Sequence, residues 1–155
     1  MFHLPVSSGR LAITLDDLVW VEDGRNITLA RGFPTDGLSL PGIARALGFD
    51  PWGKGLRAAL LHDAGYSMHD RDEFSLGDRA TVDRRFRRGC EIDFPNMAPA
   101  YYWAVRAFGW GPWASGNAMH MEGYLYALRE GALDGWIEHI LSQHGGKIVD
   151  LRAAD

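Results

Sequence analysis

The stretch that decides the fold is "AALLHDAGYSMHD", residues 58–70, in which an apolar run contains a His–Asp pair followed by a tyrosine. The apolar residues predict a buried helix. His62 and Asp63, however, carry groups that normally contact water, a metal or another polar group. Because residues four apart share a helix face, His62 and Tyr66 lie along one side, and Asp63 points about 100° away. The stretch therefore predicts a buried helix that carries a polar site.

Residues 77–91, "GDRATVDRRFRRGCE", predict a second helix, and its Asp83 is the natural partner for His62. A histidine that acts as a base or a ligand is usually oriented by a carboxylate on its other ring nitrogen. If this helix packs antiparallel to the helix of residues 56–68, Asp83 lies opposite His62. In the alternative interpretation, His62 ends its helix and bonds a backbone carbonyl, with Asp63 in a surface ion pair.

Arginines surround the predicted partner on the same helix. Arg79 and Arg87 each lie four residues from Asp83, so each could form an ion pair with it.

Two carboxylates are candidates for holding a divalent cation, either calcium or zinc. Asp63 is adjacent to His62, and Asp36 lies in "PTDGLS", an Asp-Gly loop that can present a carboxylate together with carbonyl oxygens. The alternative for Asp36 is a turn aspartate that bonds its own backbone two residues on.

The rest of the chain predicts a mainly helical α+β fold with a small N-terminal β-hairpin or sheet. "DLVWVEDGRNITLA" contains two β-rich runs, near 18–21 and 26–30, around an Asp23–Gly24 turn, and a loop follows at 31–42. We expect one compact helical domain over 1–155, with five or six helices. Its parts are a β-rich front at 1–35, a motif-bearing helical core at 40–114 and additional C-terminal helices at 117–145. The predicted helices cover 41–48, 54–68, 77–91, 97–109, 119–131 and 134–144.

The helix at 97–109 and the tryptophans around it raise a separate question. "MAPAYYWAVRAFG" is apolar nearly all round, which predicts a central helix. Trp103, Trp110 and Trp113 follow in "WAVRAFGWGPW". We expect core packing around a Gly-Pro turn, and a membrane-edge or partner-binding platform is the alternative.

Composition excludes several classes of function. The 155 residues are 46% hydrophobic and 23% charged, with a formal net charge of -4, which is typical of a soluble globular protein and argues against nucleic acid as a partner. Cys90 is the single cysteine, so the fold cannot depend on an intrachain disulfide. No apolar run approaches the roughly 20 residues of a membrane span, so we do not expect an integral membrane protein. The first ten residues lack a secretory leader, and we expect synthesis in the cytoplasm.

Four motifs occur in an order and spacing that resemble one known family. They are "GFPTDGLSLP" at 32–41, "AALLHDAGY" at 58–66, "VDRRF" at 82–86 and "AVRAFGWGPW" at 104–113. The chain resembles, over about residues 17 to 114, the phage and prophage family catalogued as domain of unknown function 1353 (DUF1353). It departs from the family pattern in having Leu38 where a small residue is usual and no arginine after Pro41. The resemblance implies a phage context and a shared site, but no reaction, and it carries over Asp36, Gly37, Ser39, Pro41, His62, Asp63, Tyr66, Asp83, Phe86 and Arg106.

The His-Asp-x-x-Tyr motif is also similar to that of secreted phospholipases. Those enzymes place the motif on one helix and an orienting aspartate on the next. Their histidine activates a water, and the adjacent aspartate binds calcium together with carbonyls of a glycine-rich loop. The likeness implies these roles for His62, Asp63 and Asp83, with the loop at 32–37 as the carbonyl source. This chain departs from them in having no disulfides.

Two functional hypotheses follow. In the first, a phage-encoded accessory protein uses His62 as general base, Asp83 as its orienter and Tyr66 in the same catalytic set, with Asp63 and Asp36 as cation ligands. Its substrate would be a lipid or a peptidoglycan bond of the host envelope.

In the second hypothesis, the chain is a non-catalytic component of the virion, in the tail or baseplate, whose partners are other virion proteins. The His/Asp set would then be a buried structural network, and the chain would pass from the host cytoplasm into the particle.

Overall fold

The computed structural model describes residues 3–6, 12–35, 54–71, 73–115, 120–144 and 147–150. The chain divides into two compact units, the first comprising Met1–Asp36 with Met119–Asp155 and the second comprising Gly37–Ala118. The mainly helical α+β class is confirmed. That the whole chain forms a single domain stays a prediction.

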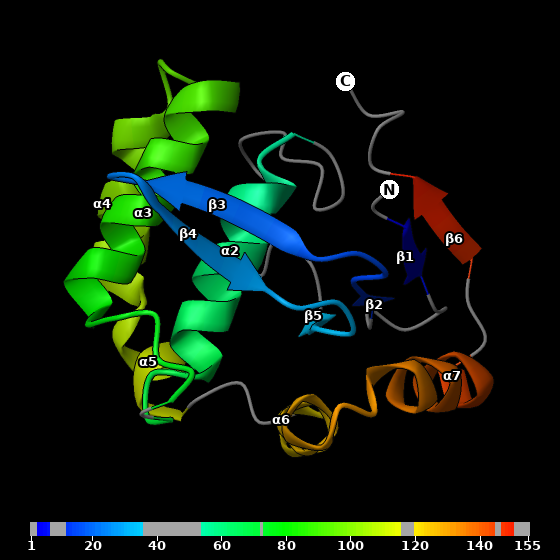
Figure 1. Cartoon of the computed structure of the whole chain (residues 1–155). Coiled ribbons are helices and arrows are strands. Elements are labelled where there is room, and N and C mark those ends of the chain that lie inside the picture. Colours follow the sequence, from blue (N-terminus) through cyan, green and yellow to red (C-terminus); the bar gives the residue numbers. More distant parts are fainter. Residues whose placement is uncertain are drawn as a thin grey trace. The chain divides into compact units, whose positions relative to one another are not determined.

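Among the described residues, the β-structure of the first unit comprises three antiparallel strand pairs (Figure 1). β3 (Leu18–Glu22) pairs with β4 (Arg25–Leu29), which confirms the predicted hairpin. Asp23 and Gly24 in its turn have φ of 49° and 74°, and two left-handed residues in succession are what a tight two-residue hairpin requires. The two other pairs are β1 (His3–Val6) with β6 (Lys147–Asp150) and β2 (Ala12–Ile13) with β5 (Pro34–Thr35).

Two amphipathic helices complete the first unit, as predicted. α6 (Met121–Glu130) ends at Gly131, whose φ of 66° suits a glycine, and α7 (Leu133–His144) follows. Side chains of both helices bond the backbone after β4. Tyr124 Oη donates to the Ala30 carbonyl at 2.9 Å, and Trp136 Nε1 donates to the Gly32 carbonyl at 2.8 Å.

The second unit is helical. α2 (Leu56–Ser67), α3 (Arg79–Asp93) and α4 (Ala98–Phe108) lie within about two residues of the predicted helices. A short α5 (Trp110–Ser115) follows α4 and was not predicted as a separate helix. The predicted helix at 41–48 lies outside the described residues.

α2 and α3 run antiparallel, which was the condition for the predicted site. The backbone N–H of Gly55, just before α2, donates to Asp93 Oδ2 at the end of α3 over 2.7 Å. The other end of α3 is capped by Asp78, whose side chain accepts from the Thr81 N–H at 2.7 Å. The two helices approach closely at Gly65, because a Cβ atom there would lie 2.5 Å from Val82 Cγ1.

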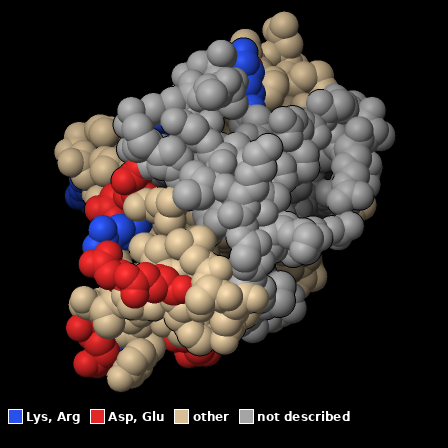
Figure 2. All heavy atoms as spheres, turned by 90° about the vertical axis from the view of Figure 1, so that its right-hand side faces the viewer, with Lys and Arg blue, Asp and Glu red and all other residues tan. Residues whose placement is uncertain are grey.

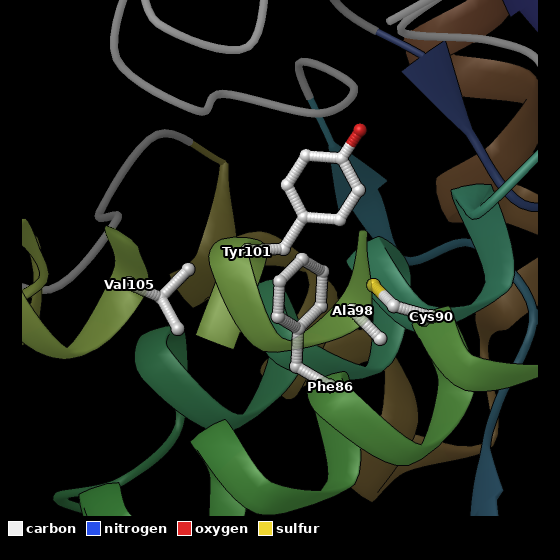
Figure 3. Close-up of a cluster of buried hydrophobic side chains, with 6 residues drawn as sticks. Phe86, Cys90, Ala98, Tyr101 and Val105 are labelled. Carbon is white, nitrogen blue, oxygen red and sulfur yellow. The ribbon is translucent and has the colours of Figure 1, made fainter. Parts of the chain in front are cut away.

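α3 and α4 share a hydrophobic core (Figure 3). Phe86 and Cys90 of α3 pack against Ala98, Tyr101 and Val105 of α4, and Ala58 of α2 joins them.

The prediction that the helix at 97–109 is central was wrong. Only the side of α4 with Ala98, Tyr101 and Val105 is buried, whereas Trp103 is 67% exposed. A helix that is apolar all round does not specify which of its sides is covered.

Acidic side chains predominate over basic ones among the described residues on the face shown in Figure 2, in keeping with the net charge of -4. In the part of the chain that the structure describes, no helix is both long enough and apolar enough to cross a membrane.

Gly65→Ala should destabilise the second unit, because the added methyl group meets both Cγ atoms of the buried Val82. Overpacking of this kind costs about 1–3 kcal/mol, which thermal unfolding will report as a lower melting temperature. Gly111→Ala is the matched control, since nothing lies within 4 Å of its Cβ position. Equal melting temperatures for the two variants would contradict the close α2–α3 approach.

Candidate functional site

The candidate site is built around the carboxylate of Asp83, whose side chain is 0% exposed. Its Oδ1 lies 3.0 Å from His62 Nε2 and accepts a hydrogen bond from Tyr66 Oη at 2.8 Å. Its Oδ2 accepts from Arg106 Nη1 at 3.0 Å, and Arg79 Nε lies 3.7 Å away as a further ion pair. Both carboxylate oxygens are therefore compensated, by groups from three helices.

Helix geometry explains why these side chains meet. His62 and Tyr66 lie four residues apart on α2, and their rings stack with centroids 4.2 Å apart. Arg79 and Asp83 have the same spacing on α3. Arg106 reaches the carboxylate from α4.

Arg79 is the second buried charge of the site, with 7% of its side chain exposed. Its Nε donates to Tyr66 Oη at 3.2 Å, and its Nη2 donates to the carbonyls of Val105 and Arg106 at 3.0 and 2.5 Å. Its guanidinium also lies 4.4 Å from the ring centroid of Trp110. Arg79 therefore joins the carboxylate to the end of α4 and to α5.

The surroundings fix the charge of each group. Burial raises the pKa of the Asp83 carboxyl, but hydrogen bonds from His62, Tyr66 and Arg106 outweigh it and hold that pKa below its ordinary value. Burial lowers the pKa of His62, against the opposing effect of Asp83, so the imidazole is neutral at pH 7. Burial raises the pKa of Tyr66 to about 12, so the phenol keeps its proton and donates it.

The charge of Asp83 also decides the tautomer of His62. An ionised carboxylate can only accept hydrogen bonds, so His62 Nε2 must carry the hydrogen and donate it. The lone pair of the neutral ring is therefore on Nδ1. Among the described residues, buried polar atoms without a hydrogen-bond partner do not include His62 Nδ1. The His62 side chain is 11% exposed. The arrangement is that of a general base held by an orienting carboxylate.

Aromatic side chains of α5 cover the tyrosine of the site. Trp113 contacts Tyr66 edge to face, with ring centroids 5.0 Å apart, and stacks on His69 at 4.1 Å. His69 Nδ1 donates to the Tyr66 carbonyl at 2.9 Å, since a carbonyl only accepts. Gly109 lies directly against Tyr66 Oη, where a Cβ atom would collide with it.

The structure confirms the predicted contact between His62 and Asp83 and places Tyr66 on the same carboxylate. Of the two arginines expected near Asp83, Arg79 forms the ion pair. Arg87, the other arginine that could have paired with Asp83, bonds Glu91 at 2.9 Å instead.

Arg106 was named as a motif position, but its contact with Asp83 was not foreseen. The available signal was its position as the only charged residue between 94 and 115. A lone arginine in an apolar helix needs a buried acidic partner or access to water.

The proposed cation site, with Asp63 and Asp36 as ligands, is not tested by the described residues. Asp36 lies outside the described residues. Asp63 is half-buried on α2. Among the residues that the structure describes, no three His, Cys, Asp or Glu side chains are grouped to hold a metal, so His62, Asp63 and Asp83 do not form such a set by themselves. A cation site that includes Asp36 stays a prediction.

Fold and site together define a helical protein with a buried His–Asp pair held by two arginines. The family model described as "Protein of unknown function (DUF1353)" matches residues 14–105, which is more than half of the chain, and the chain belongs to this family. No curated protein and no solved structure matches the chain.

The stability of the protein should fall on acidification because the pKa of both His62 and Asp83 is lowered in the folded state. The unfolded chain then binds more protons at acidic pH, so the free energy of unfolding decreases as the pH falls, first below about 6.5 for His62 and then below about 3.8 for Asp83. Melting temperatures between about pH 5 and pH 8 will report the His62 part. His62→Gln should flatten this dependence, and His139→Gln, at an exposed position on α7, should not. The same pH dependence in all three proteins would contradict the neutral His62.

Asp83→Asn should destabilise the protein by about 3–5 kcal/mol, because it leaves Arg79 buried without its counter-charge. Urea unfolding will measure the change. Asp70→Asn removes an exposed aspartate that pairs with Arg71 and should change stability by less than about 1 kcal/mol. Similar losses for both variants would show that the buried carboxylate has no special role.

Proposed function

We propose that the chain is a phage-encoded accessory protein with a hydrolase-type site, in which His62 activates a water molecule against a bond of the host envelope. The observation that carries this proposal is the 3.0 Å contact of His62 Nε2 with the buried carboxylate of Asp83. This contact fixes the tautomer that leaves Nδ1 as a base, and burial keeps the ring neutral.

In the proposed reaction, His62 Nδ1 removes a proton from water while the water oxygen forms a bond to the carbonyl carbon of an ester or amide. The tetrahedral intermediate then collapses, the bond to the leaving group breaks, and Nδ1–H returns the proton to the leaving oxygen or nitrogen. Asp83 stabilises the imidazolium formed in between. Tyr66, Arg79 and Arg106 act as positioning residues, because they contact Asp83.

The phage context and the envelope substrate rest on the resemblance to phage and prophage proteins. A phospholipid ester and a peptidoglycan bond are both candidate substrates. The predicted divalent cation, with Asp63 and Asp36 as ligands, would polarise the carbonyl oxygen when bound. The steps above need only the described side chains.

A second function is a non-catalytic virion component in which the same residues form a structural network. The complete burial of Asp83 and the compensation of both its oxygens favour it. A buried network of this kind fixes one packing of its helices without any catalytic role, although Arg79 Nη1 has no hydrogen-bond partner among the described residues.

His62→Gln separates the two functions. A general base contributes about 10²–10⁴ in rate, so under the first proposal the variant loses hydrolysis by at least about 100-fold while it remains folded. The measurement uses phospholipid vesicles and purified host peptidoglycan, with calcium or zinc added, and detects released products by mass spectrometry. His139→Gln is the control and should keep full activity.

Failure of the wild-type protein to release product from either substrate with either cation would refute the hydrolase. Strong destabilisation by His62→Gln, together with the protein's presence in purified virions, would support the structural role instead.

A further inference from the structure

The surface formed by α4 and α5 exposes large aromatic side chains, and the site does not use all of them. Trp103 is 67%, Phe108 54% and Trp110 66% exposed. On α4, Pro99, Trp103 and Ala107 are spaced by four residues and are all exposed, so they form one apolar face. We call the exposed side chains of Pro99, Ala100, Trp103, Ala107, Phe108 and Trp110 the α4–α5 surface.

The expectation that these tryptophans pack in the core was therefore wrong for Trp103 and Trp110, while Trp113 is half-buried against Tyr66. Apolar side chains that are exposed together in one patch are typical of interaction surfaces.

The segment of the sequence that contains α4 is positively charged, although the chain as a whole is acidic. Residues 84–114 contain five arginines and two acidic residues, Glu91 and Asp93, so this segment has a formal charge of +3. The rest of the chain has a formal charge of -7, which together gives the net charge of -4. No acidic residue lies between 94 and 115. The charge complements an anionic surface and does not suit a basic partner.

The guanidinium of Arg87 lies next to the aromatic side chains of α4. The Arg87 guanidinium lies 5.6 Å from the ring centroid of Tyr102, and the ring of Tyr102 lies 5.3 Å from that of Trp103. Arg87 is about half exposed, at 44% of its side chain, and its Nε donates to Glu91, which is exposed to a similar extent. A guanidinium beside exposed indole rings is a combination that fits phosphate groups next to an apolar layer.

The same surface is connected to the Asp83 site. Trp110 covers the guanidinium of Arg79, which bonds Tyr66 Oη, and Trp113 packs on the ring of Tyr66. A partner that binds to α5 would therefore contact tryptophans that themselves contact Arg79 and Tyr66, the groups that hold Asp83.

We propose that the α4–α5 surface docks on the surface of an anionic phospholipid bilayer. Tryptophan and phenylalanine enter the boundary between headgroups and acyl chains, and Arg87, which borders them, faces the lipid phosphates. Docking requires no hydrolysis by the protein. That the docked lipid is also the substrate rests on the function proposed above.

Co-sedimentation of the full chain with vesicles tests the docking. We expect binding to vesicles of phosphatidylcholine mixed with phosphatidylglycerol, weaker binding to phosphatidylcholine alone, and weakening by added salt. Trp103→Ala should lower the partition coefficient roughly tenfold or more. Tyr126→Ala, which removes an equally exposed aromatic ring from α6, should leave binding unchanged.

His62→Gln should bind vesicles like the wild type, so docking and hydrolysis can fail independently. Binding without product release would support the docking and refute the hydrolase. The docking proposal is overturned if Trp103→Ala binds as the wild type does, or if the two lipid compositions bind equally. It is also overturned if Trp103→Ala instead abolishes self-association measured by light scattering without lipid, because the surface would then join two copies of the chain.

Discussion

The second unit of the structure depends on keeping one carboxylate charged where water does not reach it. Moving an unpaired charge from water into a protein interior costs several kcal/mol, so Asp83 is tolerated only because donors surround it. His62 and Tyr66 come from α2, Arg79 from α3 and Arg106 from α4. The packing of α2, α3 and α4 therefore also supplies the hydrogen bonds and ion pairs that Asp83 needs.

The compensation of Asp83 also determines the chemistry that is open to the site. Burial lowers the pKa of His62, and the nearby guanidinium of Arg79 acts in the same direction, so His62 stays neutral. The ionised carboxylate sets the tautomer of the imidazole. The same contacts extend outward, since Arg79 and Tyr66 contact the two tryptophans of α5. Stability and protonation state thus depend on the same side chains, and Trp110 connects them to the exposed aromatic surface.

Much of this arrangement could be predicted from the sequence because it depends on local spacing. The four-residue spacing of His62 and Tyr66 fixed their common face, and the Asp23–Gly24 turn fixed the hairpin. The contact of Arg106 could not be predicted in this way, because it depends on how α4 is rotated and an apolar composition on all sides does not encode a rotation. The pairing of β1 with β6 joins the two ends of the chain, which no local pattern indicates. Asp36 lies outside the described residues, so the prediction of a cation site is still to be tested.

The most direct test of this account is the ¹⁵N NMR spectrum of the His62 imidazole, recorded as a function of pH and assigned by comparison with His62→Gln. We expect a neutral ring at pH 7 with the hydrogen on Nε2 and a pKa below 6.5. Asp83→Asn should remove the preference for this tautomer. A ring that is protonated at pH 7, or one that carries its hydrogen on Nδ1, would contradict the account.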